Sequence, residues 1–391
     1  MTDPLDPGRS VGVYVHWPYC SRICPYCDFN VVRDRGRTEE QARLVEAILA
    51  DLEAQADRLN PDGRRPLASI FFGGGTASLM APAAVARILG RIHDLFSATG
   101  PIEITLEANP TDAEAGRFAD LAAAGINRLS LGVQSLDDAA LRFLGRDHSA
   151  AEARRAIDLA RAAFPRLSID LIYARPDQTV AEWEAELTTA VDLGFEHVSP
   201  YQLTIEPDTA FGRAFRRGTL VPPDEDLAAD LYDATQATLG DAGFKAYEVS
   251  NHARATPGKE GAARSAHNLH VWRGGDYVGV GPGAHGRLTL DGRRTATVAH
   301  RAIAAYVEGV AARTPWSDID PLDAPAAAEE RILLGLRTVE GVTTADLQTL
   351  GLEPRVDSLI TDGLLHRAQG RIAATPAARP MLDSVLKLLL T

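Results

Sequence analysis

Residues 13–27 read VYVHWPYCSRICPYC, an apolar run followed by a short loop that holds all 3 cysteines of the chain. Cys20, Cys24 and Cys27 are odd in number, and the loops between them are too short to gain much from a disulfide. A structural zinc ion normally has four protein ligands, and no His or Cys follows at a zinc-finger distance. We therefore predict an iron–sulfur cube, in which one iron stays open to a ligand that is not protein. A structural zinc site stays the alternative.

The composition limits the class of protein. With 391 residues, the chain exceeds the roughly 100–200 residues of a typical domain, so we expect one large domain and one smaller one. Its net charge of -13 would repel the phosphate backbone of a nucleic acid. We find no apolar run of about 18 residues, and Met1 to Ser10 lack the apolar region of a signal peptide. We expect a cytoplasmic protein, because that compartment keeps thiols reduced.

Strand-like and helix-like stretches alternate from residue 11 to about residue 203. The expected strands are 11–17, 68–72, 102–107, 127–133, 167–173 and 197–203. The expected helices are 39–59, 82–98, 113–124, 150–163 and 180–193. Strict alternation predicts a parallel sheet covered by helices, and these units are too few for a closed eight-fold barrel. We predict an α/β fold with a partial (β/α)6 barrel of the TIM type in residues 1–250.

The rest of the chain has a different residue composition. Residues 251–266 are small and polar, as in an exposed loop. They begin a connecting region, 251–315, that also contains the sequence HNLHVW at 267–272 and a glycine-rich run at 279–286. We predict a smaller, winged-helix-like domain in residues 316–391. Its expected elements are helices at 325–338, 344–350 and 354–363, a hairpin, and a last helix that ends at Leu390.

A winged-helix unit often binds DNA, but the charge of this one favours another role. The helix that would enter the groove, near Arg355 to Asp362, has one arginine and two aspartates. These carboxylates would face the phosphate backbone. We therefore favour a structural or protein-docking role, and we expect no nucleic-acid partner.

Ligands of parallel α/β proteins bind at the carboxyl ends of the strands. The residues that fall there are the cysteine loop, Gly73 to Thr76, Glu107, Gln134, Ser135, Asp170 and Tyr173, with Arg146 shortly after the fourth strand. Consecutive glycines let a backbone approach a ligand closely. A carboxylate such as Glu107 suits an amine or a hydroxyl, and Arg146 suits a carboxylate. Taken singly, each has a structural explanation as a turn or a salt bridge, but together they describe one pocket.

The spacing Cys20-x3-Cys24-x2-Cys27, preceded by Tyr14-x-His16-x-Pro18, resembles the radical S-adenosylmethionine (SAM) proteins, and within them the oxygen-independent coproporphyrinogen III oxidase branch. The resemblance runs from about residue 11 to the C-terminus. It implies a [4Fe-4S] cluster on the three cysteines, with SAM chelating the open iron through its amino and carboxylate groups. It implies SAM contacts at Tyr14, Tyr26, Gly74, Gly75, Thr76, Glu107, Gln134, Arg146 and Asp170.

Two functions within that branch remain open. The catalytic oxidases use a 5'-deoxyadenosyl radical, carry a fourth cysteine two residues after the third, and have a longer segment before the first strand. Phe29 stands at the position of the fourth cysteine, and residues 1–10 precede the first expected strand. Both departures resemble the HemW-type heme chaperones, as does the sequence CPYCDFN at 24–30. The resemblance therefore implies a chaperone that delivers heme to acceptors such as respiratory cytochromes. The alternative is an oxidase of coproporphyrinogen III or a related porphyrin.

The heme chaperones carry a His-Asn-x-x-Tyr-Trp motif, which residues 267–272 match except for Val271 in place of the tyrosine. Neutral imidazole is a common axial ligand of heme iron, so we assign His267 as the candidate heme ligand. The alternative roles are loop capping by His267 and ligation by His270. Further candidates are His16, His252 and His285, although His16 is expected to support the cluster loop. The sequence leaves open the heme acceptor, SAM cleavage, peripheral membrane association and a homodimer.

Overall fold

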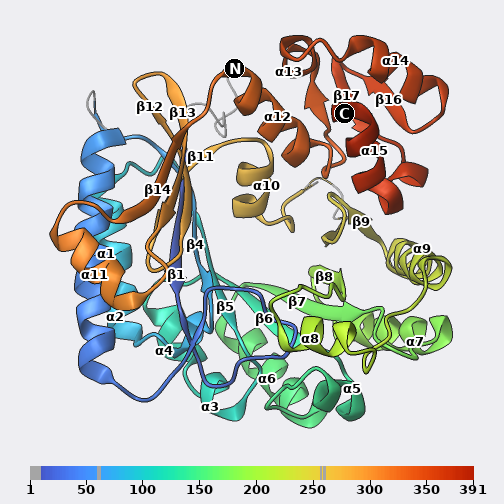
Figure 1. The fold of residues 1–391 in the computed structure, drawn as a ribbon. Helices are drawn as coiled ribbons and strands as arrows, with labels where there is room; N and C mark the ends of the chain where they lie inside the picture. Colours follow the sequence, from blue (N-terminus) through green and yellow to red (C-terminus); the bar gives the residue numbers. More distant parts are fainter. Residues whose placement is uncertain (1–9, 60–62, 256–257, 259–260) are drawn as a thin grey trace.

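The computed structural model describes residues 10–59, 63–255, 258 and 261–391, and its largest feature is one curved sheet (Figure 1). Within these residues the sheet has 12 strands in the order β14-β13-β12-β11-β1-β4-β5-β6-β7-β8-β10-β9. Six consecutive strands of it are the predicted ones: β1 (Val11–Trp17), β4 (Leu67–Gly74), β5 (Glu103–Ala108), β6 (Arg128–Gln134), β7 (Arg166–Tyr173) and β8 (His197–Gln202). Each pairs in parallel with the next. The predicted α/β fold is confirmed.

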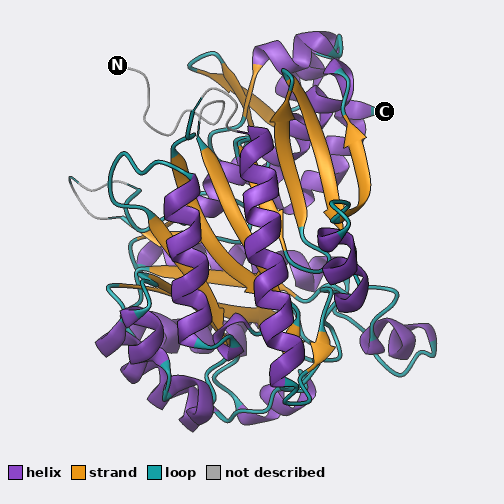
Figure 2. Ribbon diagram, turned by 90° about the vertical axis from the view of Figure 1, so that its left-hand side faces the viewer, coloured by secondary structure: helices purple, strands orange, loops and turns teal. Residues whose placement is uncertain are grey.

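Helices cover the outer face of these strands. In Figure 2, seen from the side of α1 and α2 in Figure 1, long helices lie in front of the sheet. The covering helices are α1 (Thr38–Leu59), α2 (Pro82–Leu95), α3 (Asp112–Ala115), α4 (Phe118–Ala123), α6 (Ala150–Ala163) and α7 (Val180–Asp192). Every residue of β4 is buried, as expected for a parallel strand with cover on both faces. The predicted apolar face of α1 is confirmed as well, since Leu44, Val45, Ile48 and Leu52 are buried.

The helix starts have local causes. Ser149 and Thr179 precede α6 and α7, and each forms a capping box with the glutamate three residues later, Glu152 or Glu182. Such a box satisfies free N–H groups at both helix starts. The predicted helix 113–124 is divided into α3 and α4. Elements that the sequence analysis did not predict in this part of the chain are η1 (Ala77–Leu79), α5 (Asp138–Phe143), α8 (Ala210–Arg216) and α9 (Glu225–Asp241).

The sheet continues past both ends of the predicted six strands. On the β1 side, β11 (Asp276–Val280) pairs in parallel with β1. Three antiparallel strands follow: β12 (His285–Leu290), β13 (Arg293–Ala299) and β14 (Trp316–Pro321). Helix α11 (Ile303–Ala311) lies between the last two in the chain. Much of the predicted connecting region is therefore part of the sheet, although the proposed boundaries at 250 and 315 stay predictions.

The predicted exposed loop at 251–266 is wrong at its start. His252–Arg254 form β10, which pairs antiparallel with β8 and with β9 (Phe244–Ala246). Pairing at this edge satisfies backbone groups that a loop would leave to water, and His252 and Ala253 are buried. Residues 256–257 and 259–260 of that prediction lie outside the described residues. Next, residues 266–272 form a short helix, α10 (Ala266–Trp272), so HNLHVW is helical.

The C-terminal segment has a separate apolar core. Its elements are α12 (Ala324–Gly335), β15 (Val342–Thr343), α13 (Thr344–Thr349), α14 (Glu353–Thr361), β16 (Leu365–Ala368), β17 (Arg371–Ala374), η2 (Pro376–Met381) and α15 (Leu382–Leu390). A small sheet has the order β15-β17-β16. These helices and the hairpin match the predicted elements. Across the described segments of the chain, we find no helix with both the length and the apolar character needed to cross a bilayer.

Candidate cluster and cofactor site

The cysteine loop is held in place at both of its ends. Strand β2 (Tyr19–Cys20) pairs in parallel with β3 (Val32–Arg33). The His16 Nε2 donates to the carbonyl oxygen of Asn30 at 2.9 Å, and the Tyr14 hydroxyl donates to His16 Nδ1 at 3.1 Å. His16 thus supports the loop, as predicted, by joining β1 to the residues that follow the last cysteine.

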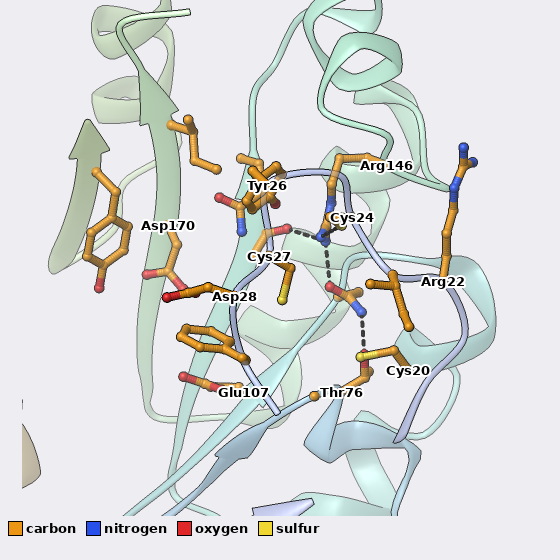
Figure 3. A pocket seen from close by; sticks show the side chains of 18 of the residues that line it. Cys20, Arg22, Cys24, Tyr26, Cys27, Asp28, Thr76, Glu107, Arg146 and Asp170 are labelled. Atoms are coloured by element: carbon orange, nitrogen blue, oxygen red, sulfur yellow. Dashed lines mark hydrogen bonds between the residues drawn. The ribbon is translucent and has the colours of Figure 1, made fainter. Parts of the chain in front are cut away.

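The loop covers a cavity of about 430 Å³ at the carboxyl ends of the parallel strands. Its lining includes these predicted residues: Cys20, Cys24, Tyr26, Cys27, Gly74, Gly75, Thr76, Glu107, Gln134, Arg146 and Asp170. In the view of Figure 3, the three cysteines lie to one side of the carboxyl groups of Glu107 and Asp170. The structure therefore brings these residues together, while Tyr14 and His267 line an adjacent cavity. We call the first space the cysteine cavity.

The three thiols line one cavity. Among the described residues, no three His, Cys, Asp or Glu side chains converge closely enough to hold one metal ion. A structural zinc ion needs such convergence, with sulfur atoms about 2.3 Å from the metal, so this arrangement gives no support to the zinc alternative. In an iron–sulfur cube each thiolate binds a different iron.

Burial affects the thiols themselves. It raises the pKa of Cys20 to about 12, although a hydrogen bond with Thr76 acts in the opposite direction. Burial likewise raises the pKa of Cys27. Arg146 Nη1 lies 3.2 Å from Cys24 Sγ and donates to it. Because a metal ligand must be a thiolate, metal binding to these cysteines has to release protons.

Arg146 and Gln134 present polar atoms that lack partners. The other terminal nitrogen of Arg146, Nη2, donates to Asn109 Oδ1 at 2.5 Å and to the Gly132 carbonyl at 3.0 Å. Its Nε, however, is shielded from solvent and has no hydrogen-bond partner among the residues that the structure describes, and the same is true of Oε1 of Gln134. Gln134 also has a positive φ of 67°. A buried unpaired polar group costs about 1–3 kcal/mol, so both residues suit a ligand with its own donors and acceptors.

Two buried carboxyl groups face the same space. Glu107 accepts from the Gly74 N–H at 3.2 Å, and Asp170 accepts from the Ser130 hydroxyl at 3.1 Å. Burial, and then the negative charge of Asp170, raise the pKa of Glu107 to about 8. Burial also raises the pKa of Asp170 to about 6. A cationic ligand would favour the ionised carboxylates, so this wall of the cavity suits an ammonium or a hydroxyl group.

Gly74, the last residue of β4, and Gly75, which follows it, are explained by close packing. Gly74 has φ of +108°, and a Cβ there would lie 2.6 Å from the His16 ring. A Cβ on Gly75 would lie 2.7 Å from the Tyr19 carbonyl oxygen. The N–H groups of both are already used, by Glu107 and by the Trp17 carbonyl. The run therefore lets the strand end meet the cysteine loop, and its N–H groups are not free for a ligand.

Tyr14 and His267 line a second cavity of about 570 Å³, which we call the His267 cavity. Its lining residues are Tyr14, His16, Asp28, Phe29, Asn30, Gly74, Glu107, His267, Val271, Tyr277, Gly283, His285, Val298 and Arg301. Asp28, Phe29, Gly74 and Glu107 also line the cysteine cavity. The two cavities therefore share a wall.

His267 is fixed in orientation and keeps one ring nitrogen available. Its Nδ1 hydrogen-bonds with the Ser69 hydroxyl at 2.8 Å, and its ring centroid lies 5.0 Å from that of Phe71. Its Nε2 has no hydrogen-bond partner among the described residues. Burial lowers the pKa of His267 to about 3, so the imidazole is neutral. A neutral, oriented imidazole with a free nitrogen has the features of a metal ligand.

The competing roles for these histidines are resolved by their contacts. The predicted capping alternative for His267 is wrong, because Ser265 caps α10 by accepting from the Asn268 N–H at 3.3 Å. His270 donates through Nε2 to the Asp276 carbonyl at 2.7 Å and is buried. His252 bonds Gln236 and lines neither cavity. His285 lines the His267 cavity, is exposed, and makes no ring hydrogen bond with the described residues.

Sequence reasoning missed several lining residues. Asn109 donates to Thr76 Oγ1 at 2.9 Å and accepts from Arg146, which connects two strand ends. It follows Glu107 closely at the end of β5, so its position was a usable signal. From the sequence, Phe29 is notable only as the residue in place of the fourth cysteine. In the structure Phe29 is 62% exposed and lines both cavities. No pattern in the sequence indicated Arg301 as a lining residue, because strands far apart in the chain bring it to the cavity.

Comparisons with known proteins agree with this geometry. The model of the radical SAM superfamily matches residues 14–190, and that of the HemN C-terminal domain matches residues 322–381. The solved structure of the coproporphyrinogen III oxidase HemN from Escherichia coli is similar, with a TM-score of 0.79, 20% identity, and coverage of 99% of this chain and 92% of the other. At that identity the likeness shows the fold, which is the radical SAM fold.

Relatives of higher identity define the family. The chain is 36% identical to the heme chaperone HemW of Escherichia coli, over 97% of this chain and 98% of that protein. It is 37% identical to the HemW of Mycobacterium tuberculosis, with coverage of 98% and 96%. It is also 38% identical to the mitochondrial radical S-adenosyl methionine domain-containing protein 1 of Bos taurus, with coverage of 99% and 89%. The chain belongs to the HemW family of radical SAM proteins, a membership that implies SAM and an iron–sulfur cluster.

Proposed function

We propose that this protein is a heme chaperone that uses a [4Fe-4S] cluster and SAM. The observation that carries the proposal is His267, which lines a cavity that shares a wall with the cysteine cavity and whose Nε2 has no hydrogen-bond partner among the described residues. An axial ligand is normally oriented by a hydrogen bond on its other ring nitrogen, which Ser69 supplies here. The relatives named heme chaperones support the same proposal.

The residues of each cavity fit the group proposed for it. Cys20, Cys24 and Cys27 would hold the cluster. SAM carries an ammonium, which matches the buried carboxyl groups of Glu107 and Asp170 and the unpaired Oε1 of Gln134, and a carboxylate, which matches the unpaired Nε of Arg146. The remaining predicted SAM contacts are Tyr26, Gly74, Gly75 and Thr76 in the same cavity, with Tyr14 beside it. When bound, the cluster supplies one-electron chemistry to SAM; in a chaperone it serves assembly or control.

Heme would occupy the His267 cavity. Its volume of about 570 Å³ lies within the range of ordinary cofactor sites. Val271, which replaces the tyrosine of the family motif, lines this cavity and supplies an apolar wall. We propose that the bound heme passes to acceptor proteins, of which respiratory cytochromes are one class, and that this happens in the cytoplasm. A homodimer and peripheral membrane association are further proposals that need direct measurement.

The oxidase alternative has a specific observation in its favour. The cysteine cavity contains all of the predicted SAM-contact residues except Tyr14, and it adjoins the cavity proposed for the tetrapyrrole. A porphyrin side chain would therefore lie near SAM. Against this alternative stands Phe29, at the position where the oxidases carry their fourth cysteine.

One experiment separates the two functions. The protein is reconstituted anaerobically with iron and sulfide, then incubated with SAM and either heme or coproporphyrinogen III, the latter together with dithionite as reductant for the cluster and an electron acceptor. We expect a stable heme Soret band and no conversion of coproporphyrinogen III. Formation of protoporphyrinogen IX would establish the oxidase instead. Absence of heme binding by the fully reconstituted protein would contradict the chaperone.

A further inference from the structure

Arg301 stands at the edge of the His267 cavity with no anionic partner. It is exposed and is the only Arg or Lys among the described residues that line this cavity. Its side chain makes a weak contact, 3.5 Å from Nε to Asn30 Oδ1. In the described part of the chain no carboxylate lies within ion-pair distance of it. Its terminal nitrogens are therefore available to an external anion.

The position of Arg301 is fixed from the cysteine loop. Asn30 Nδ2 donates to the Arg301 carbonyl at 2.9 Å and to the Pro282 carbonyl at 2.8 Å. These bonds hold the segment after β13 beside the residues that follow Cys27. Phe29, next to Asn30, is 62% exposed and lines the same cavity. An exposed aromatic ring and a free guanidinium are thus kept together at one cavity.

The chemistry of the lining changes along the cavity. His267 is 6% exposed and packs against Phe71, whereas Arg301 and His285 are exposed. Val271, Val298 and Phe29 supply apolar surface. The carboxyl groups in the lining are Asp28 and Glu107, of which Glu107 is assigned to the SAM ammonium. The cavity therefore combines a buried imidazole, apolar walls and an exposed cation.

Heme has the matching distribution of groups: a central metal, an apolar ring, and two carboxylates at one edge. We propose that Arg301 binds a heme propionate, with the His285 ring as a second donor, so that this edge of the macrocycle lies at the exposed side of the His267 cavity. This inference rests on the proposed function and adds to it the residues that fix how heme is oriented. Guanidinium and carboxylate form one of the stronger charge-assisted pairs in proteins.

The test compares heme with its dimethyl ester, in which both carboxylates are blocked. Kd values come from Soret titrations of the full-length reconstituted protein and of Arg301→Gln, Arg301→Lys and Arg154→Gln. Arg154 is an exposed arginine of α6 and lines neither cavity, so it controls for loss of a surface charge. We expect Arg301→Gln to weaken heme binding about tenfold and to leave ester binding within about twofold.

The conservative variants sharpen the result. Arg301→Lys keeps the charge and should retain part of the preference for heme over its ester, whereas Arg154→Gln should retain all of it. His285→Ala should lower the preference by about twofold to threefold, as expected for a neutral donor. Equal losses of heme and ester in Arg301→Gln, or no loss of either, would overturn the inference while leaving the chaperone proposal intact. Failure of the unmodified protein to bind either ligand would remove the proposed function itself.

Discussion

The cysteine cavity and the His267 cavity share a wall but are built in different ways. The first takes its residues from successive strand ends and the loop after β1, an order that follows the chain. The second combines β1 with α10, β11, β12 and β13, from a distant part of the chain. In repeated βα units, the residues at the carboxyl ends of the strands lie at one predictable edge of the sheet. The positions of residues on the additional strands depend instead on which strands pair with each other. The two cavities should therefore respond separately to mutation, except at the wall that they share.

The largest effect is expected at Cys24, where a substitution should affect the cysteine cavity and leave the His267 cavity unchanged. Cys24→Ala removes one of three cluster ligands, so the iron–sulfur absorbance and the iron content after anaerobic reconstitution should be lost. Heme binding should stay within about threefold of the unmodified protein, because Cys24 does not line the His267 cavity. Iron analysis and Soret titration on the same preparation measure both. A variant that keeps its cluster would refute the ligand assignment.

Glu107 tests the shared wall. Its pKa is about 8 in the folded protein against an ordinary value of 4.5, so the folded state binds a proton more tightly than the unfolded state. Glu107 should therefore contribute a decline in the free energy of unfolding of the metal-free protein as the pH rises from about 4.5 to about 8. Glu107→Gln should remove that decline, so the variant should gain roughly 5 kcal/mol relative to the unmodified protein across this pH range.

Urea unfolding at several pH values, under reducing conditions, provides the measurement. Glu182→Gln serves as the control, because Glu182 is exposed and lies in the capping box of α7. That variant should keep the pH-dependent decline. Parallel curves for the unmodified protein and Glu107→Gln would show that the carboxyl group is not held neutral by burial.

His267 tests the second cavity alone. His267→Ala should weaken heme binding by about tenfold to a hundredfold, through loss of an oriented ligand, and should leave the iron–sulfur absorbance unchanged. His366→Ala, at an exposed histidine of β16, is the matched control. Unchanged heme affinity in His267→Ala would remove this residue from the site. Loss of the cluster in the same variant would show that the two cavities are not separate.

The smallest effect is expected at Phe29. Phe29→Cys restores the fourth cysteine of the oxidases, yet the three cysteines already present are the predicted cluster ligands, so the iron content per chain should not change. Heme affinity should fall about threefold, since an aromatic contact is worth roughly 0.5–1.5 kcal/mol. Phe29→Leu is the control for apolar surface without an aromatic ring. An increase in cluster content would show that residue 29 reaches the metal.

The added strands show where sequence reasoning failed. Residues 276–286 carry glycines at 279, 281, 283 and 286, a pattern that favours turns over strands. In the folded chain these glycines permit close approach: a Cβ on Gly279 would lie 1.9 Å from the His285 carbonyl oxygen, and one on Gly281 would lie 2.2 Å from that of His16. The composition that concealed the strands is the one that lets them pack.

The sequence by itself determined the cluster loop, the parallel sheet and the chemistry of the strand ends, because cysteine spacing and βα alternation act over short distances along the chain. Only the tertiary structure decided which of His252, His267 and His270 lines a cavity. His267 lines the second cavity with its Nδ1 bonded to Ser69, whereas His252 and His270 bond Gln236 and Asp276 and line neither of the two cavities. The structure also brought Arg301 to the His267 cavity. The placement of His267 and Arg301 depends on sheet register and on hydrogen bonds across 198 and 271 residues of chain, which residue patterns do not encode.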